Sequence, residues 1–289
     1  MPAPTPTALT TKRGKMPETP GHTSRPADPA TPAKEQETGD FWSHLDVLRG
    51  TIIRSLVAVT VLSVAAFAAK GPLFDALLAP SHPDFVIYRL YDRLSALAGG
   101  YAEPFALTLL TTQLASQLMV HLQAAVCVGL IVAAPYILYE LFRFVAPGLY
   151  PAELRLARRA LTGGFLLFAA GVALTYFLIF PLTLRFLATY QVDPSIGNYI
   201  TLSSYMSTLL TLSLGMGLCF ELPLVLWILG RLGVVDRPML ARMRRHAVVA
   251  ILIVVAVITP TTDVLTLIVV FLPVYMLYEL SLLAVPRRR

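Results

Sequence analysis

Long apolar runs are the feature of this sequence that most limits its fold. Six segments are almost free of charge, and the longest match the roughly 20 apolar residues that a helix needs to cross a bilayer. Hydrophobic residues make up 56% of the chain and charged residues 14%, well below the charged share of soluble domains. Because lipid offers the backbone no hydrogen-bond partners, each run is expected to be a helix. The sequence therefore predicts an all-α polytopic membrane protein.

The six predicted transmembrane helices lie at about 51–69, 122–145, 161–182, 205–229, 247–259 and 264–285. The last two are predicted to be short. The apolar part of the fifth ends at Ile258 and spans about 18 Å, whereas a hydrocarbon core is about 30 Å thick. The apolar part of the sixth ends near Leu277, before Tyr278 and Glu279. We predict two thin spans, with a re-entrant hairpin as the alternative.

The distribution of basic residues predicts the orientation. With the N-terminus inside, 19 of the 23 Lys and Arg residues fall on inner segments, and Lys70, Arg89, Arg93 and Arg185 fall outside. Inner loops of membrane proteins carry this excess of positive charge. Both termini are therefore predicted to lie in the cytosol.

The sequence predicts one membrane domain at 41–286, between a disordered tail at 1–40 and a basic tail at 287–289. The first segment is rich in Pro, Thr and charge, so it has little apolar surface to bury. The two cysteines, Cys127 and Cys219, lie within apolar runs and have no metal-ligand spacing. No metal, cofactor or nucleic acid is expected.

Two polar features lie at the predicted inner surface. His44, Asp46 and Arg49 precede the first span on an amphipathic turn or two of helix. Glu153 lies among three arginines in the loop between the second and third spans, which also holds Tyr150. Each can be read as ordinary surface polarity or as a binding site.

Two further polar features lie within or beside the later spans. Glu221 falls inside the fourth span, where an ionisable group normally faces a cavity or a partner. It has two readings, a buried structural hydrogen bond or a functional polar cavity. Pro223 removes a backbone donor nearby and predicts a kink. Thr259 and Asp263 bound the turn between the last two helices, and both suit a tight turn.

Enzymatic interpretations lack the necessary parts. The sequence has no Gly-x-Ser-x-Gly elbow, no His-Glu-x-x-His motif and no phosphate-binding P-loop. We therefore expect no catalysis. A small-solute or ion-coupled transporter is the alternative function, although only Glu221 is deep and no internal repeat is evident.

Together these features resemble the TatC family, the multispanning receptor subunit of the twin-arginine protein translocase. The resemblance covers about residues 41–285 and rests on four motifs in the family's order. The matching residues are His44, Leu45, Leu48 and Arg49, then Pro147, Leu149, Tyr150 and Glu153, then Phe220–Leu224, and finally Thr259, Pro260, Asp263 and Leu277–Glu279. Each motif is weak alone, but the set is specific.

The resemblance implies a receptor for twin-arginine signal peptides of folded cargo in the bacterial cytoplasmic (inner) membrane. It implies single-span TatA and TatB partners and a homo-oligomer within the complex. Signal-peptide binding is expected at Glu153, Asp46, His44, Arg49 and Tyr150. Partner contact inside the membrane is expected at Glu221, Pro223, Thr259 and Asp263.

The chain departs from the family pattern at two positions. Val47 stands where the family has its first recognition glutamate, and Asp46 lies one position earlier. Either Asp46 replaces that carboxylate, although one residue turns a helix by about 100°, or Glu153 acts alone. Leu267 stands where similar members often have a glutamine, which leaves Thr259 as the polar candidate near that position.

Overall fold

The computed structural model describes residues 32–97, 107–145, 154–191, 193, 195, 198–259 and 263–285. By its internal contacts the chain divides into Met1–Leu45 and Asp46–Arg289, and the second unit holds nearly all of the described helices. The α-helices are α1 (Pro32–Ala68), α2 (Lys70–Leu78), α3 (Val86–Leu97), α4 (Ser116–Val145), α5 (Leu154–Leu174), α6 (Phe180–Thr189), α7 (Leu202–Phe220), α8 (Leu222–Arg231), α9 (Arg237–Arg242), α10 (Arg244–Ile258) and α11 (Val264–Ala284). The strands are β1 (Leu109–Leu110) and β2 (Ile200–Thr201).

Five described helical segments are long and apolar enough to cross a membrane. They are Leu45–Ala68, Ser116–Val145, Ala160–Thr189, Leu202–Arg231 and Val264–Leu283. The sixth predicted span is α10, whose 15 residues extend about 22 Å. The α-helical membrane class and the short fifth helix are thus confirmed, while six crossings and the orientation stay predictions.

The predicted short sixth helix is wrong. Helix α11 is 21 residues long and continues past Glu279 to Ala284. Its polar residue does not end the span because Arg244 lies 2.9 Å from one carboxylate oxygen of Glu279. The Tyr275 hydroxyl donates to the other oxygen at 3.1 Å. A paired carboxylate is tolerated near the end of a span, where an unpaired one is expensive.

Prolines interrupt two of the spans. Pro223 lies in the first turn of α8 and has no N–H to donate, and the helix breaks at Glu221, between α7 and α8. The backbone there tightens, since Glu221 N–H donates to Leu218 O at 3.1 Å. The predicted kink is therefore present. Before Pro181, the chain instead widens into a π-helical turn, Thr175–Ile179, that joins α5 to α6.

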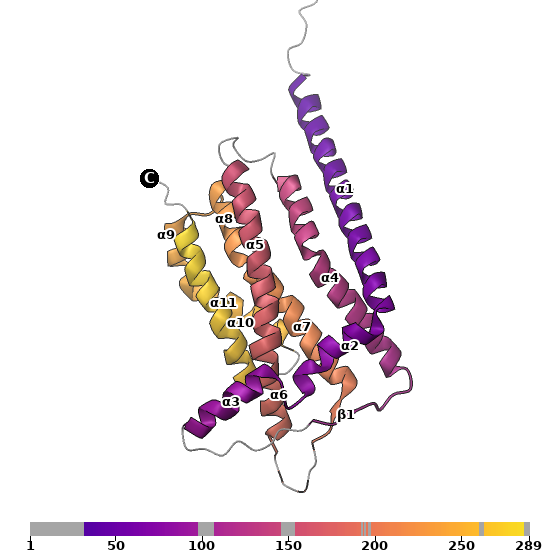
Figure 1. The fold of residues 1–289 in the computed structure, drawn as a ribbon. Helices are drawn as coiled ribbons and strands as arrows, with labels where there is room; N and C mark the ends of the chain where they lie inside the picture. The colour runs from indigo at the N-terminus through magenta and orange to yellow at the C-terminus, as the bar shows by residue number, and fades with distance from the viewer. Residues whose placement is uncertain are drawn as a thin grey trace, which may run out of the picture. The chain divides into compact units, whose positions relative to one another are not determined.

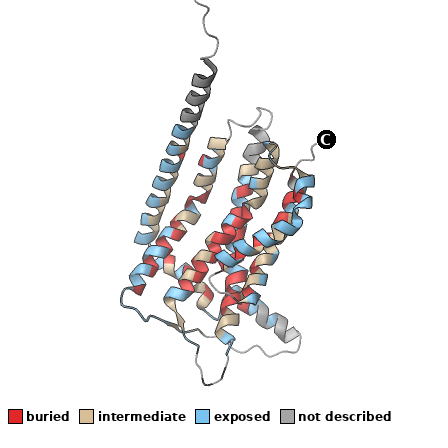
Figure 2. Cartoon of the chain, turned by 180° about the vertical axis from the view of Figure 1, so that it is seen from behind, coloured by how far each residue is buried: buried red, intermediate tan, exposed pale blue. Residues whose placement is uncertain are grey.

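Helix α7 forms the centre of the packed core, and most of its residues are buried. It approaches α5 so closely that a Cβ on Gly171 would lie 2.8 Å from Met216 O. Helix α1 differs from the others, as Figure 2 shows by its largely exposed surface. In the most apolar stretch of its span only 6% of the residues are buried, against 44% in the spans that contain α4 and α7. It therefore depends on few contacts within the protein.

The elements gather at two ends of the membrane domain (Figure 1). One end holds α9, the end of α4 and the start of α10, with Arg143, Arg237, Arg242, Arg244 and Arg245. The opposite end holds α2, α3, α6 and the strand β1. This separation agrees with the predicted inner and outer faces.

Backbone pairing of two strands and a tyrosine hydrogen bond stabilise the end that holds α2 and α3. Strands β1 and β2 pair in parallel, with Leu109 opposite Ile200. Tyr88 of α3 donates its hydroxyl to Pro80 O at 3.0 Å, and Pro181 O lies 3.4 Å away. Burial raises the pKa of Tyr88, so the phenol stays a hydrogen-bond donor.

Candidate functional site

A charged cluster centred on Glu140 joins α1 to α4. Arg54 of α1 donates to Glu140 Oε2 from Nε at 3.0 Å and from a terminal nitrogen at 2.8 Å. The Tyr136 hydroxyl donates to Oε1 at 3.3 Å, and Arg143 lies 3.9 Å from that oxygen. The Glu140 side chain is only 3% exposed, whereas that of Arg54 is 43% exposed. The buried carboxylate of Glu140 thus faces two arginines, Arg54 and Arg143, near the end of the domain that carries α9.

Glu221 is the second buried carboxylate, and its surroundings differ. It lies at the break between α7 and α8 and is 6% exposed. Neither of its oxygens has a hydrogen-bond partner among the described residues. Oε2 points towards α5, where a Cβ on Gly164 would approach it to 3.0 Å. An unpartnered buried carboxylate is costly, so this position suits a group supplied from outside the chain.

The turn between α10 and α11 is held by its own side chains. Thr259 is buried, and its hydroxyl donates to Val255 O at 2.9 Å. Asp263 caps α11, accepting from the Thr266 N–H at 2.7 Å. The other oxygen of Asp263 has no hydrogen-bond partner in the described part of the chain. Both residues therefore stabilise local structure.

The predicted signal-peptide residues are described only in part. Glu153 and Tyr150 lie outside the described residues, as does the His44 side chain. Asp46 and Arg49 are exposed on α1. The structure therefore leaves Asp46 and Arg49 accessible to a ligand.

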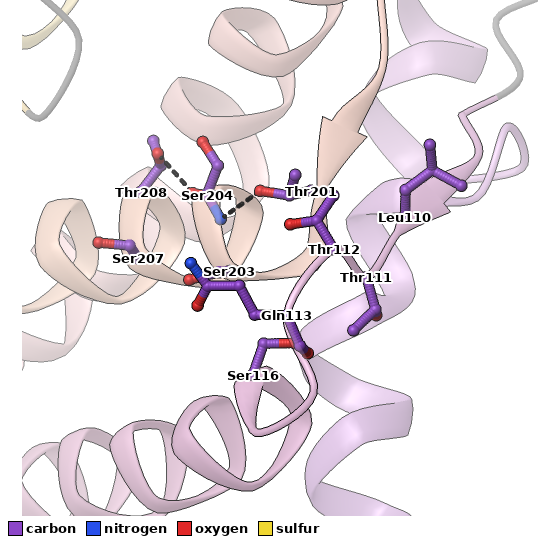
Figure 3. A pocket seen from close by; sticks show the side chains of 10 residues that line it. All are labelled: Leu110, Thr111, Thr112, Gln113, Ser116, Thr201, Ser203, Ser204, Ser207 and Thr208. Carbon is purple, nitrogen blue, oxygen red and sulfur yellow. Dashed lines mark hydrogen bonds between the residues drawn. The ribbon is translucent and has the colours of Figure 1, made fainter.

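A pocket rich in hydroxyl groups lies at the end that carries β1 (Figure 3). It has a volume of about 400 Å³ and is lined by Leu110, Thr111, Thr112, Gln113, Ser116, Thr201, Ser203, Ser204, Ser207 and Thr208. The Thr201 hydroxyl accepts from the Ser204 N–H at 3.2 Å and caps α7. No pattern in the sequence predicts this pocket, because the long-range β1–β2 pairing brings its two halves together.

Metal and cofactor binding have little support in the described ranges. No group of three His, Cys, Asp or Glu side chains gathers there in a way that could hold a metal ion. Cys127 and Cys219 are buried and free. The polar side chains present are suited to hydrogen bonding and ion pairing with a ligand or a partner.

The fold and these polar positions define a multi-pass α-helical membrane protein with two buried carboxylates, Glu140 and Glu221. Residues 43–273 match the family Sec-independent protein translocase protein (TatC). The chain belongs to the TatC family and is a subunit of the Sec-independent protein translocase. Its resemblance to that family in sequence motifs is thereby confirmed.

The relatives cover most of the chain. The Deinococcus radiodurans protein TatC is 35% identical over 253 residues, which are 88% of this chain and 87% of the relative. The Carboxydothermus hydrogenoformans protein TatC is 30% identical over 248 residues, or 86% and 93% of the two chains. A crystal structure of a twin arginine translocase receptor, TatC, superposes with a TM-score of 0.68 at 31% identity. That match covers 83% of this chain and 97% of the other.

Sequence reasoning missed the partnership of Arg54 and Glu140. Arg54 was counted only among the 19 inner basic residues, and Glu140 lies outside the four motifs of the resemblance. A signal was available, because Tyr136, Glu140 and Arg143 are spaced to share one helix face. The sequence contains no comparable signal for the pairing with Arg54, 86 positions away.

Proposed function

We propose that this chain is the signal-peptide receptor of a twin-arginine translocase in a bacterial cytoplasmic membrane. It binds the paired arginines of a signal peptide at its cytosolic face and nucleates a complex with single-span TatA and TatB-type proteins. The observation that carries this proposal is the match to a solved twin arginine translocase receptor over 83% of the chain.

Arginine recognition is proposed for the carboxylates of the cytosolic face. A guanidinium presents several donors in a planar fork and pairs with a carboxylate through two hydrogen bonds, which the ammonium of lysine cannot match. Glu153 is the first candidate, and the other candidates are Asp46, His44, Arg49 and Tyr150. Asp46 is exposed on α1, which supports its inclusion.

Partner helices are proposed to meet the chain at Glu221, Pro223, Thr259 and Asp263. Glu221 supports this proposal because both of its oxygens lack partners among the described residues. In the part of the chain that the structure describes, one oxygen of Asp263 also lacks a hydrogen-bond partner. A polar side chain from a neighbouring span would satisfy either group.

Peptide binding tests the proposed function. The purified protein is expected to bind a peptide with two adjacent arginines at least about tenfold more tightly than the same peptide with two lysines. Fluorescence anisotropy in detergent measures both affinities. Co-purification with small single-span proteins is expected as well. Equal affinity for the two peptides, together with solute flux in liposomes, would instead indicate the competing transporter function.

The short helix α10 supports a second part of the proposal, that the bilayer is thinned beside it to ease entry of the signal's apolar segment. Four leucines inserted into α10 lengthen its apolar part by about 6 Å and remove about half of the mismatch. Export of a twin-arginine reporter is expected to fall several-fold, measured by cell fractionation. Four Gly and Ser residues inserted after Ser195, outside the spans, are the control and leave export unchanged. Full export with the longer α10 would contradict the thinning.

A further inference from the structure

The ion pair between Arg54 and Glu140 places a guanidinium of the protein itself on a buried carboxylate. A guanidinium is also the group that the proposed function requires the chain to recognise. Glu140 lies near the C-terminal end of α4, on the same side of the domain as α9. The predicted orientation makes this side cytosolic. We propose that Glu140 is a second arginine-binding group, which Arg54 occupies at rest and an arginine of the signal peptide takes over. This inference rests on the proposed function.

The geometry leaves room for exchange. Both donors of Arg54 converge on the single oxygen Oε2, at 3.0 and 2.8 Å. Oε1 is bound more weakly, by Tyr136 at 3.3 Å. The parallel arrangement, in which each carboxylate oxygen takes one donor, is therefore not used. An incoming guanidinium that engages both oxygens would gain the interaction that Arg54 does not make.

The charges favour exchange over simple addition. Glu140 already faces two cations, Arg54 at 2.8 Å and Arg143 at 3.9 Å. A third guanidinium would meet net positive charge unless one of the two withdrew. Arg54 can withdraw because its side chain is 43% exposed and long enough to reach the membrane surface. The Glu140 side chain, at 3% exposed, cannot move in the same way.

Exchange would also explain how a chain with Val47 binds paired arginines. Val47 is apolar, and Glu140 is a buried carboxylate that the same helix contacts through Arg54. One signal arginine would then pair with Glu153 and the other with Glu140. Release of Arg54 would loosen α1, whose span is only 6% buried.

Removing the resident competitor tests the proposal. If Arg54 holds Glu140 about nine-tenths of the time, the Arg54→Ala variant is expected to bind the two-arginine peptide about tenfold more tightly than the unmodified protein. A purely structural ion pair predicts the opposite sign, because its loss would disorder α1 and weaken binding. Fluorescence anisotropy with the purified full-length protein measures the change.

Two further variants separate a freed carboxylate from a loosened helix. Glu140→Gln breaks the same ion pair but removes the proposed ligand, so it is expected to weaken binding. The double variant Arg54→Ala with Glu140→Gln is expected to lose the whole gain. A gain that persists in the double variant overturns the proposal, as does unchanged or weaker binding in Arg54→Ala.

A conservative variant keeps the proposal testable if Arg54→Ala does not fold. Arg54→Lys keeps the positive charge but offers one donor nitrogen in place of the two that Arg54 directs at Oε2, so a smaller gain in the same direction is expected. If Arg54→Ala does not purify as a monodisperse protein, the Lys variant decides, and unchanged binding overturns the proposal. Failure of the unmodified protein to prefer arginine over lysine would overturn the proposed function itself. A preserved preference without any gain would overturn only the exchange.

Discussion

Replacing Glu153 with glutamine is expected to reduce export of a twin-arginine reporter by roughly tenfold to a hundredfold. Glutamine keeps the shape of the side chain and one acceptor oxygen, but it loses the negative charge and the second acceptor. Hydrogen bonds to charged groups are the stronger class, and removal of one such partner changes affinity by about this factor. Cell fractionation of the reporter measures the effect.

Matched variants show whether Glu153 acts alone. Asp46→Asn removes the exposed carboxylate that neighbours Val47. A comparable loss of export would indicate that Asp46 replaces the family's glutamate, whereas unchanged export would leave recognition to Glu153 and other carboxylates. If Asp46 is the replacement, Val47→Glu in the Asp46→Asn background is expected to restore export. Normal export with Glu153→Gln would contradict its assignment as the first arginine-binding residue.

Replacing Glu221 with methionine is expected to stabilise the isolated protein while it reduces export. Both oxygens of Glu221 are buried without hydrogen-bond partners among the described residues. A side chain of similar length without polar atoms removes that penalty, which is roughly 1–3 kcal/mol for a buried unsatisfied group. Thermal unfolding in detergent measures the gain. Export is expected to fall at least severalfold, because the proposed partner contact is lost.

Thr183 of α6 provides the control for this trade-off. Its hydroxyl is also buried without a partner in the described part of the chain, and the residue is 1% exposed. Thr183→Val keeps the shape and is expected to raise stability slightly with no change in export. If Glu221→Met exports normally, the carboxylate has no role in partner contact. If it destabilises the protein, Glu221 has an internal partner that compensates its burial.

Much of the architecture follows from local properties of the chain. Each long apolar run has a transfer free energy into lipid that no distant contact can reverse, so the membrane class could be predicted from sequence alone. The break at Pro223 is equally local, because a missing N–H acts within one turn. Even the short α10 follows from the position of Arg244 and Arg245 before its apolar run.

Other features depend on neighbours that the sequence does not reveal. The continuation of the last span past Glu279 could not be predicted, although the helix bounds were close, because the sequence does not show that Arg244 pairs with this carboxylate. The hydroxyl pocket forms only when β1 meets β2 across 91 positions of sequence, from Leu109 to Ile200. Both cases depend on a contact between segments that are far apart in the sequence.

The buried carboxylates Glu140 and Glu221 also show which properties follow from local sequence and which from tertiary packing. Sequence alone determined that the chain is a multi-pass membrane protein with a carboxylate inside its fourth span, because hydrophobicity and proline act locally. Only the tertiary structure decided that Glu140 is paired with Arg54 while Glu221 has no partner among the described residues. An ion pair requires two side chains within about 4 Å, and helix packing, not sequence order, sets that distance.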